Sequence, residues 1–196
     1  MDMPFDASDA ETDDALLARY ARGDAAAARA LTARLAPKAF SHALRVLGDR
    51  MEAEDVAQDA MMRLWKIAPK WRAGEAKVST WLYRVTANLC TDRLRRRGRA
   101  GPALDDIPEP EDPMPGADAR LLAASRAEAI TAALRGLPDR QRQSIVLRHF
   151  EGLANPEIAE VLGISVEAVE SLTARAKRAL AAALGPMKDA LGYEDG

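Results

Sequence analysis

The chain has 196 residues, of which 48% are hydrophobic and only 5% aromatic, so aliphatic side chains and alanine must build its core. Twenty-eight basic and 30 acidic residues leave a net charge of −2, which excludes a uniformly basic nucleic-acid or membrane binder. No apolar run approaches the roughly 18 residues of a membrane span, and the single cysteine, Cys90, excludes a disulfide framework or a cysteine-rich zinc site. We therefore expect a cytoplasmic protein without membrane insertion.

Residues 1–13 are expected to form an acidic tail, because residues 1–14 carry six acids and no base. Hydrophobic periodicity and cap residues predict eight helices, at 13–22, 25–47, 52–68, 78–97, 119–135, 139–151, 155–162 and 166–184. No stretch shows the two-residue alternation of a strand. The predicted fold class is all-α, with two small helical domains and a linker between them.

The predicted helix 52–68 has an apolar and a polar face. The apolar face holds Val56, Ala60, Leu64 and Ile67. The polar face holds Asp55, Gln58, Asp59, Met62 and Lys66. An acidic, amide-bearing face with a flexible methionine suits docking against a partner helix. An ordinary solvent-exposed face is the commoner origin of such a pattern.

Residues 66–100 are the basic part of the chain, with ten bases against two acids. Within it, the predicted helix 78–97 has an inward face of Val78, Trp81, Leu82, Val85 and Leu89. Its other side presents Thr80, Arg84, Asn88, Thr91, Asp92 and Arg95, and continues into Arg96 and Arg97. Bases, an amide and aromatic rings are the groups that hold single-stranded nucleic acid. We expect Trp65 and Trp81 to be core residues, whereas Trp71 falls in a predicted loop, where burial is harder to achieve.

A linker is predicted at 101–118, because residues 101–119 carry six unopposed acids and five of the eleven prolines. A proline-rich acidic run neither propagates a helix nor buries enough apolar area to fold alone. The linker separates the basic domain from a second helical unit.

The segment from Asn155 to Leu180 has the pattern of a helix-turn-helix. Asn155 is predicted to cap the first helix and Ser165 the second, with Gly163 at a turn that favours a positive φ. Small Ala159 lies where the helices approach, and Val169 and Leu172 face the core. The exposed side of the second helix holds Glu167, Glu170, Ser171, Ala174, Arg175, Lys177 and Arg178. A hairpin of helices that only packs is the alternative to DNA binding, and the low charge of this helix predicts weak DNA binding on its own.

Several motifs follow one another in a fixed order along the chain. They are Glu54-Asp55-Val56-Ala57-Gln58-Asp59 with Arg63-Leu64-Trp65, then Ser79-Thr80-Trp81-Leu82-Tyr83-Arg84-Val85-Thr86-Ala87-Asn88-Leu89, Asp92-Arg93-Leu94-Arg95-Arg96, Leu137-Pro138 and the helix-turn-helix. Over residues 14–185 this order resembles the extracytoplasmic-function group of bacterial RNA polymerase sigma factors.

The resemblance implies a promoter-specificity subunit of RNA polymerase rather than an enzyme. The first domain, 14–100, would be sigma region 2 and would bind the clamp helices of the polymerase β′ subunit through Asp55, Gln58, Asp59 and Met62. The same domain would melt and read the −10 element of promoter DNA with Trp71, Asn88, Asp92, Arg93, Arg95, Arg96 and Arg97. The second domain, 119–185, would be sigma region 4, touching the β flap and reading the −35 element with Glu167, Ser171, Arg175, Lys177 and Arg178. A C-terminal tail, 186–196, would follow, and a cognate anti-sigma factor would hold the protein inactive.

The sequence departs from the family at two positions of its recognition helix. Many members carry bases where this chain has Glu170 and Leu172, so this helix lacks two of the family's phosphate contacts and Arg175, Lys177 and Arg178 must contribute more.

Two other functions compete with this interpretation. A free-standing helix-turn-helix regulator would bind duplex DNA without polymerase, which the weakly charged reading helix disfavours. A protein-interaction module without a DNA role would leave the arginines 95–99 unexplained. Enzyme motifs are missing from the sequence, and Cys90 is expected to be a buried thiol, so we expect no catalytic residues, no metal and no cofactor.

Overall fold

The computed structural model describes residues 11–100 and 117–187, and within these ranges all side chains except those of 99–100, 117–124 and 187. The predicted tails at 1–10 and 188–196 and the linker residues 101–116 lie outside the described residues. The described chain consists of helices, turns and short connections without a strand, which confirms the all-α prediction.

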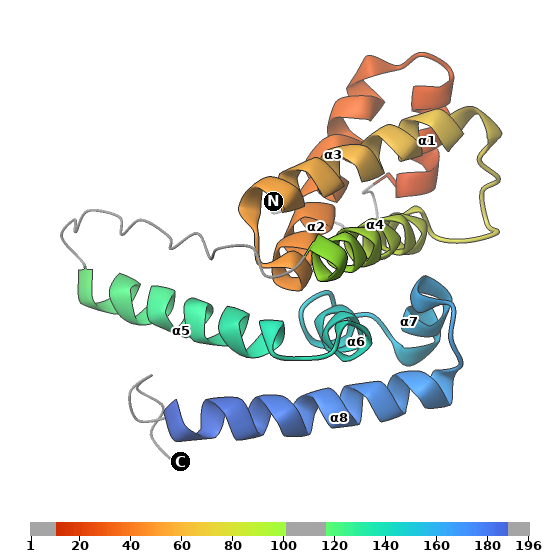
Figure 1. The fold of residues 1–196 in the computed structure, drawn as a ribbon. Helices are drawn as coiled ribbons and strands as arrows, with labels where there is room; N and C mark the ends of the chain where they lie inside the picture. The colour runs from red at the N-terminus through yellow and green to blue at the C-terminus, as the bar shows by residue number, and fades with distance from the viewer. Residues whose placement is uncertain (1–10, 101–116, 188–196) are drawn as a thin grey trace, which may run out of the picture.

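Four helices form the first domain and four the second (Figure 1). The first domain contains α1 (Asp13–Ala21), α2 (Ala25–Leu47), α3 (Arg50–Ile67), the short η2 (Ala68–Lys70) and α4 (Val78–Ala100). The second contains α5 (Ala117–Arg135), α6 (Asp139–His149), α7 (Asn155–Leu162), α8 (Val166–Leu184) and the short η3 (Gly185–Met187). All eight predicted helices are present, with ends that differ by a few residues at most.

Cap residues account for where the helices begin and end. The Asp49 carboxylate accepts a hydrogen bond from the Glu52 backbone N–H at 2.9 Å, so α3 begins at Arg50 rather than at residue 52. The helix-turn-helix has the two predicted features of its turn: Gly163 adopts φ +63°, and the Ser165 hydroxyl accepts from the Ala168 N–H.

The predicted cap at Asn155 is wrong by one position. Ala154 occupies the cap position of α7, and Asn155 is the first residue of the helix. Ala154 has no side-chain acceptor, and Glu157 instead reaches back so that its carboxylate accepts from the Ala154 N–H at 3.0 Å. Leu172 is also only half-buried, whereas Val169 is fully buried in the core as predicted.

The two domains pack against each other in a closed arrangement, with α4 alongside α6 and α7 (Figure 1). One apolar cluster joins the core of α1–α4 to buried residues of the second domain, which are Leu134, Leu137, Ile145, Val146 and Ala176. Another joins Tyr83 and Ala87 of α4 to Leu147, Leu153 and the buried face of α7. The recognition helix α8 packs on α5, α6 and α7 and lies farthest from the first domain (Figure 1). The apolar core is therefore continuous across the domain boundary.

Two buried polar side chains of α6 form hydrogen bonds across this domain boundary. The Arg142 guanidinium donates to the carbonyl of Val46 in α2 at 2.7 Å, and to two carbonyls of its own domain at 2.8 and 2.9 Å. The neighbouring Gln143 amide donates to the Thr91 hydroxyl of α4 at 2.9 Å. Burial lowers the pKa of Arg142, because the charged form is disfavoured away from water.

Candidate functional site

The predicted partner-docking residues of α3 form one exposed surface, which we call the α3 face: Asp55, Gln58, Asp59 and Met62. The side chains of Asp55, Asp59 and Met62 are 66%, 57% and 50% exposed, while the opposite side of the helix is buried in the core. A helical period of 3.6 residues produces this division. The α3 face presents two carboxylates, an amide and a thioether to solvent without rearrangement.

Met51 extends the α3 face by one turn and is not among the docking residues predicted from the sequence. It lies four residues before Asp55 and is 79% exposed. The predicted helix began at residue 52, which left Met51 outside the periodic pattern. Exposed methionines at both ends of an acidic helix face are adaptable apolar contacts for a partner helix.

Trp71 is held more firmly than its predicted loop position suggested. It is half-buried, and its indole N–H donates to the Asp14 carboxylate at 2.7 Å. Its ring meets Trp81 edge to face, with centroids 6.1 Å apart. Trp65 and Trp81 are half-buried against the core, in agreement with the core role predicted for them. Asn88, the predicted partner of Trp71 in nucleic-acid recognition, is exposed on α4.

The arginines at the end of α4 fall into two groups. Arg95 and Arg96 are exposed, and Arg95 pairs with Asp92 at 3.0 Å on its own helix. Arg93 and Arg97, four residues apart, point instead at acids of α3 and its cap. Arg97 pairs with Glu52 and Asp49 at 2.9 and 3.3 Å. The sequence placed all these bases on one nucleic-acid surface, but of these four arginines only Arg95 and Arg96 are exposed in the structure.

The exposed side of α8 carries all five predicted recognition residues. Glu167, Ser171, Arg175, Lys177 and Arg178 are exposed, while Val169 and Ala176 anchor the helix in the core. The three bases among them form no ion pair with the residues that the structure describes. The second-domain helix-turn-helix therefore presents an unobstructed cationic edge even in the closed arrangement.

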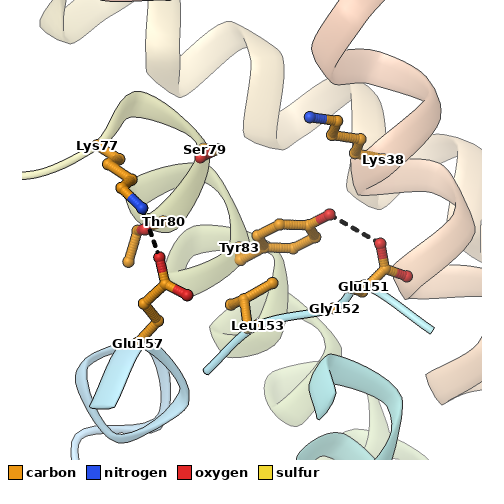
Figure 2. Close-up of a pocket in the computed structure, with 9 residues that line it drawn as sticks. All are labelled: Lys38, Lys77, Ser79, Thr80, Tyr83, Glu151, Gly152, Leu153 and Glu157. Atoms are coloured by element: carbon orange, nitrogen blue, oxygen red, sulfur yellow. Dashed lines mark hydrogen bonds and ion pairs between the residues drawn. The ribbon is translucent and has the colours of Figure 1, made fainter. Parts of the chain in front are cut away.

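A polar hollow of about 310 Å³ lies at the junction of the two domains, between α2, the start of α4 and residues 151–157 (Figure 2). At its floor the Tyr83 hydroxyl donates to Glu151 at 2.7 Å, and Arg45 approaches the same carboxylate at 3.3 Å. At its rim Lys77 pairs with Glu157 at 2.8 Å (Figure 2). Each of these contacts joins the first domain to the second.

Burial shifts the pKa values of two groups at this junction, Glu151 and His42. The Glu151 side chain is only 6% exposed, and burial raises its pKa, opposed by the Tyr83 hydrogen bond and by Arg45. At the exposed rim, the hydrogen bond from Lys77 lowers the pKa of Glu157. His42, beside the Tyr83 ring, is fully buried, and burial followed by the charge of Arg45 lowers its pKa to about 3.

The described residues contain no candidate metal site. No group of three histidines, cysteines or acids among them is arranged to hold a metal ion. Cys90 is buried, as predicted, and burial raises the pKa of its thiol to about 12. Across the helices that the structure describes, none is both long and apolar enough to cross a membrane.

Two family models match the chain, each within one of the domains. The model described as Sigma-70 region 2 matches residues 31–100, and the model described as Sigma-70, region 4 matches residues 127–180. The first match contains the α3 face and the arginines of α4, and the second contains the helix-turn-helix.

Several known proteins are similar to this chain over most of its length. The RNA polymerase sigma-H factor of Pseudomonas aeruginosa is 32% identical over 90% of this chain and 96% of its own. The ECF RNA polymerase sigma factor SigE of Mycolicibacterium smegmatis is 33% identical over 74% of this chain and 56% of its own. Among solved structures, CnrH in complex with the cytosolic domain of CnrY is similar at a TM-score of 0.66, with 29% identity over 90% of this chain and 99% of that one.

Proposed function

Because this chain belongs to the extracytoplasmic-function group of RNA polymerase sigma factors, we propose that its α3 face is the surface that docks on core polymerase. As a sigma factor it binds core RNA polymerase and directs promoter-specific initiation of transcription through the −10 and −35 elements. The observation that supports the docking assignment is the exposure of Asp55, Gln58, Asp59 and Met62 on one side of α3. Two carboxylates in that position favour a basic partner helix.

A charge reversal at the centre of the α3 face tests this assignment. Asp59→Arg should weaken the affinity for core polymerase by about tenfold or more, because like charges then meet at the interface. Glu128→Arg makes the same charge change at an exposed position of α5 and should leave the affinity unchanged. Both are measured by titrating labelled protein with core polymerase in the absence of DNA. Equal affinities for wild type and Asp59→Arg would move the docking surface elsewhere.

We propose that the promoter surfaces are divided between the two domains. The first domain would contact the melted −10 element with Trp71, Asn88, Asp92, Arg93, Arg95 and Arg96, and Arg97 would act mainly as the ion-pair partner of α3. The second would contact the −35 element with Glu167, Ser171, Arg175, Lys177 and Arg178. The exposed bases of α4 and α8 support this division.

The closed arrangement must open for both promoter elements to be read together. The −10 and −35 elements lie about 25 base pairs apart, or about 85 Å along B-form DNA. Helix α4 is only about 35 Å long, and it lies directly against α7 of the recognition unit. We propose that docking on polymerase separates the domains, which breaks the contacts of Glu151, Glu157 and Arg142 across the junction.

A protein partner that binds the closed arrangement would keep the sigma factor from polymerase. CnrH is solved with the cytosolic domain of CnrY, and the sigma factor RpoE of Bartonella quintana is solved with the anti-sigma factor NepR. We propose that a cognate anti-sigma factor also controls this chain. Such a partner should compete with core polymerase for labelled protein in solution. Simultaneous binding of both would contradict this mode of control.

Sigma factors are not a class of enzymes, and we propose that this chain has no catalytic activity and needs no metal or cofactor. We also propose that it acts in the cytoplasm, where polymerase and promoter DNA are found. The alternative of a free-standing regulator is not favoured, since the chain has the two-domain pattern of polymerase-bound factors.

A further inference from the structure

Arg93 connects the two surfaces of the first domain. One guanidinium nitrogen lies 3.4 Å from the Asp55 carboxylate and the other 4.0 Å from that of Asp59. These two acids are the charged residues of the α3 face. The Arg93 side chain is only 23% exposed, so it lies over α3 rather than extending into solvent.

The partners of Arg93 distinguish it from Arg97, which lies one turn further along α4. Arg97 donates to the Leu47 carbonyl and pairs with Asp49 and Glu52, the cap and first turn of α3. Those groups belong to the connection between α2 and α3, so their contacts with Arg97 help to hold the helices of the domain together. Among the residues that the structure describes, the ion-pair partners of Arg93 are Asp55 and Asp59, both more than half exposed and both on the surface assigned to polymerase. Whatever neutralises these acids removes the countercharges of Arg93.

We propose that Arg93 is a shared cation, held by Asp55 and Asp59 in the free protein and released to a promoter phosphate when polymerase binds. This inference rests on the proposed function. Basic groups of polymerase pair with the two carboxylates and repel the Arg93 guanidinium. The freed side chain then turns to the side of α4 that carries Asn88, where a phosphate oxygen replaces the lost carboxylates.

Such an exchange couples polymerase docking to promoter binding. In the free protein Arg93 competes with polymerase for the acids, which weakens docking. With its acids neutralised, the same side chain becomes available to DNA, which strengthens promoter binding only in the holoenzyme. The coupling is reciprocal, so promoter DNA tightens the hold of polymerase on the sigma factor.

The test replaces Arg93 and measures the two affinities separately. Arg93→Gln should bind core polymerase about twofold to fivefold more tightly without DNA, the range expected for losing a weak exposed ion pair. The holoenzyme made with it should bind promoter DNA about fivefold more weakly, with a salt dependence reduced by about one phosphate contact. Arg93→Lys keeps the charge and should leave the core affinity near wild type, and thermal unfolding verifies that both variants fold.

Arg96→Gln is the matched control, because Arg96 is exposed on the same helix and has no ion pair among the described residues. It should weaken promoter binding and leave the core affinity unchanged. If Arg93→Gln also leaves the core affinity unchanged, or weakens it, the shared-cation proposal is overturned. An unchanged promoter affinity of the Arg93→Gln holoenzyme would overturn it too. Failure of the docking assignment itself is recognised separately, by an unchanged core affinity of Asp59→Arg.

Discussion

Removing one oxygen atom from the domain junction should shift the balance between the closed and open protein. Tyr83→Phe deletes the hydroxyl that donates to Glu151 at 2.7 Å and leaves the ring in its apolar contacts. Burial raises the pKa of this hydroxyl above its usual range, so it stays a proton donor at neutral pH. The variant therefore loses a contact that joins the first domain to the second.

The expected loss of free energy follows from the chemistry of the Tyr83–Glu151 hydrogen bond. A hydrogen bond to a charged acceptor contributes about 1.5–3 kcal/mol. Glu151 keeps Arg45 at 3.3 Å in the variant, so the carboxylate is not left without a partner. The loss of free energy should then fall at the lower end of this range, about 1.5–2 kcal/mol. It should raise the ratio of open to closed protein about 10- to 30-fold.

Two measurements on Tyr83→Phe detect this shift. Distance measurements between labels in α1 and α8 should show a larger open population. The apparent affinity for core polymerase should rise by up to the same factor while the closed form predominates, because docking separates the domains and this separation costs less in the variant. Tyr20→Phe is the control, since Tyr20 packs on Trp65 in the first domain, away from the junction. Unchanged distances and affinity in Tyr83→Phe would refute the argument that this contact holds the domains together.

Three further predictions address the junction, the buried histidine and the promoter surface. Arg142→Met should lower the free energy of unfolding by about 3–5 kcal/mol, because three carbonyls, two of them in buried hydrogen bonds, lose a charged donor; urea unfolding measures this. His42 stays neutral when folded and titrates near 6.5 when unfolded, so the unfolded chain binds more protons between pH 6.5 and 3 and stability falls as the pH drops through that range. Urea unfolding should show about 2 kcal/mol lost to this group at pH 5 relative to pH 7. Asn88→Ala should impair promoter melting by the holoenzyme and leave core binding intact, as permanganate footprinting and titration can establish.

Each of these predictions has a matched comparison. Arg140 is an exposed arginine on the same helix as Arg142 with a single bond to the Leu162 carbonyl, so Arg140→Met should cost about 1 kcal/mol or less. Equal losses in the two variants would contradict the special role of Arg142. His42→Phe should remove its share of the acid sensitivity, and an undiminished dependence on pH would assign that sensitivity to other groups. Wild-type melting by Asn88→Ala would remove Asn88 from the −10 surface.

Local sequence signals predicted the helices and their exposed faces well. Helical periodicity separates Val56 and Leu64 from Asp55 and Asp59, and the structure places the first pair in the core and the second in solvent. The turn at Gly163 was predictable because φ is positive there and glycine tolerates such values. These features depend on neighbours within one or two helical turns, which the sequence displays directly.

The domain junction could not be predicted, because its contacts join residues far apart in the chain. Tyr83 meets Glu151, and Arg142 meets the Val46 carbonyl, without any local pattern that relates them. One signal was present: Arg142 lies three residues before Ile145 on the apolar side of α6, an unusual position for a charge. Similarly, the spacing of Arg93 and Arg97 shows that they share a face of α4, but not that acids of α3 lie opposite.

The continuous core across the two domains also bears on how long the free protein survives. Separating the domains exposes to water the apolar sides of Tyr83 and Ala87 on α4 and of Leu147 and Leu153 in the second domain, which pack in one cluster across the boundary. Exposed surface of this kind promotes aggregation and proteolysis. An open molecule in isolation is therefore short-lived, and mutations that loosen the junction should lower its abundance in the cell when no partner is there to cover it.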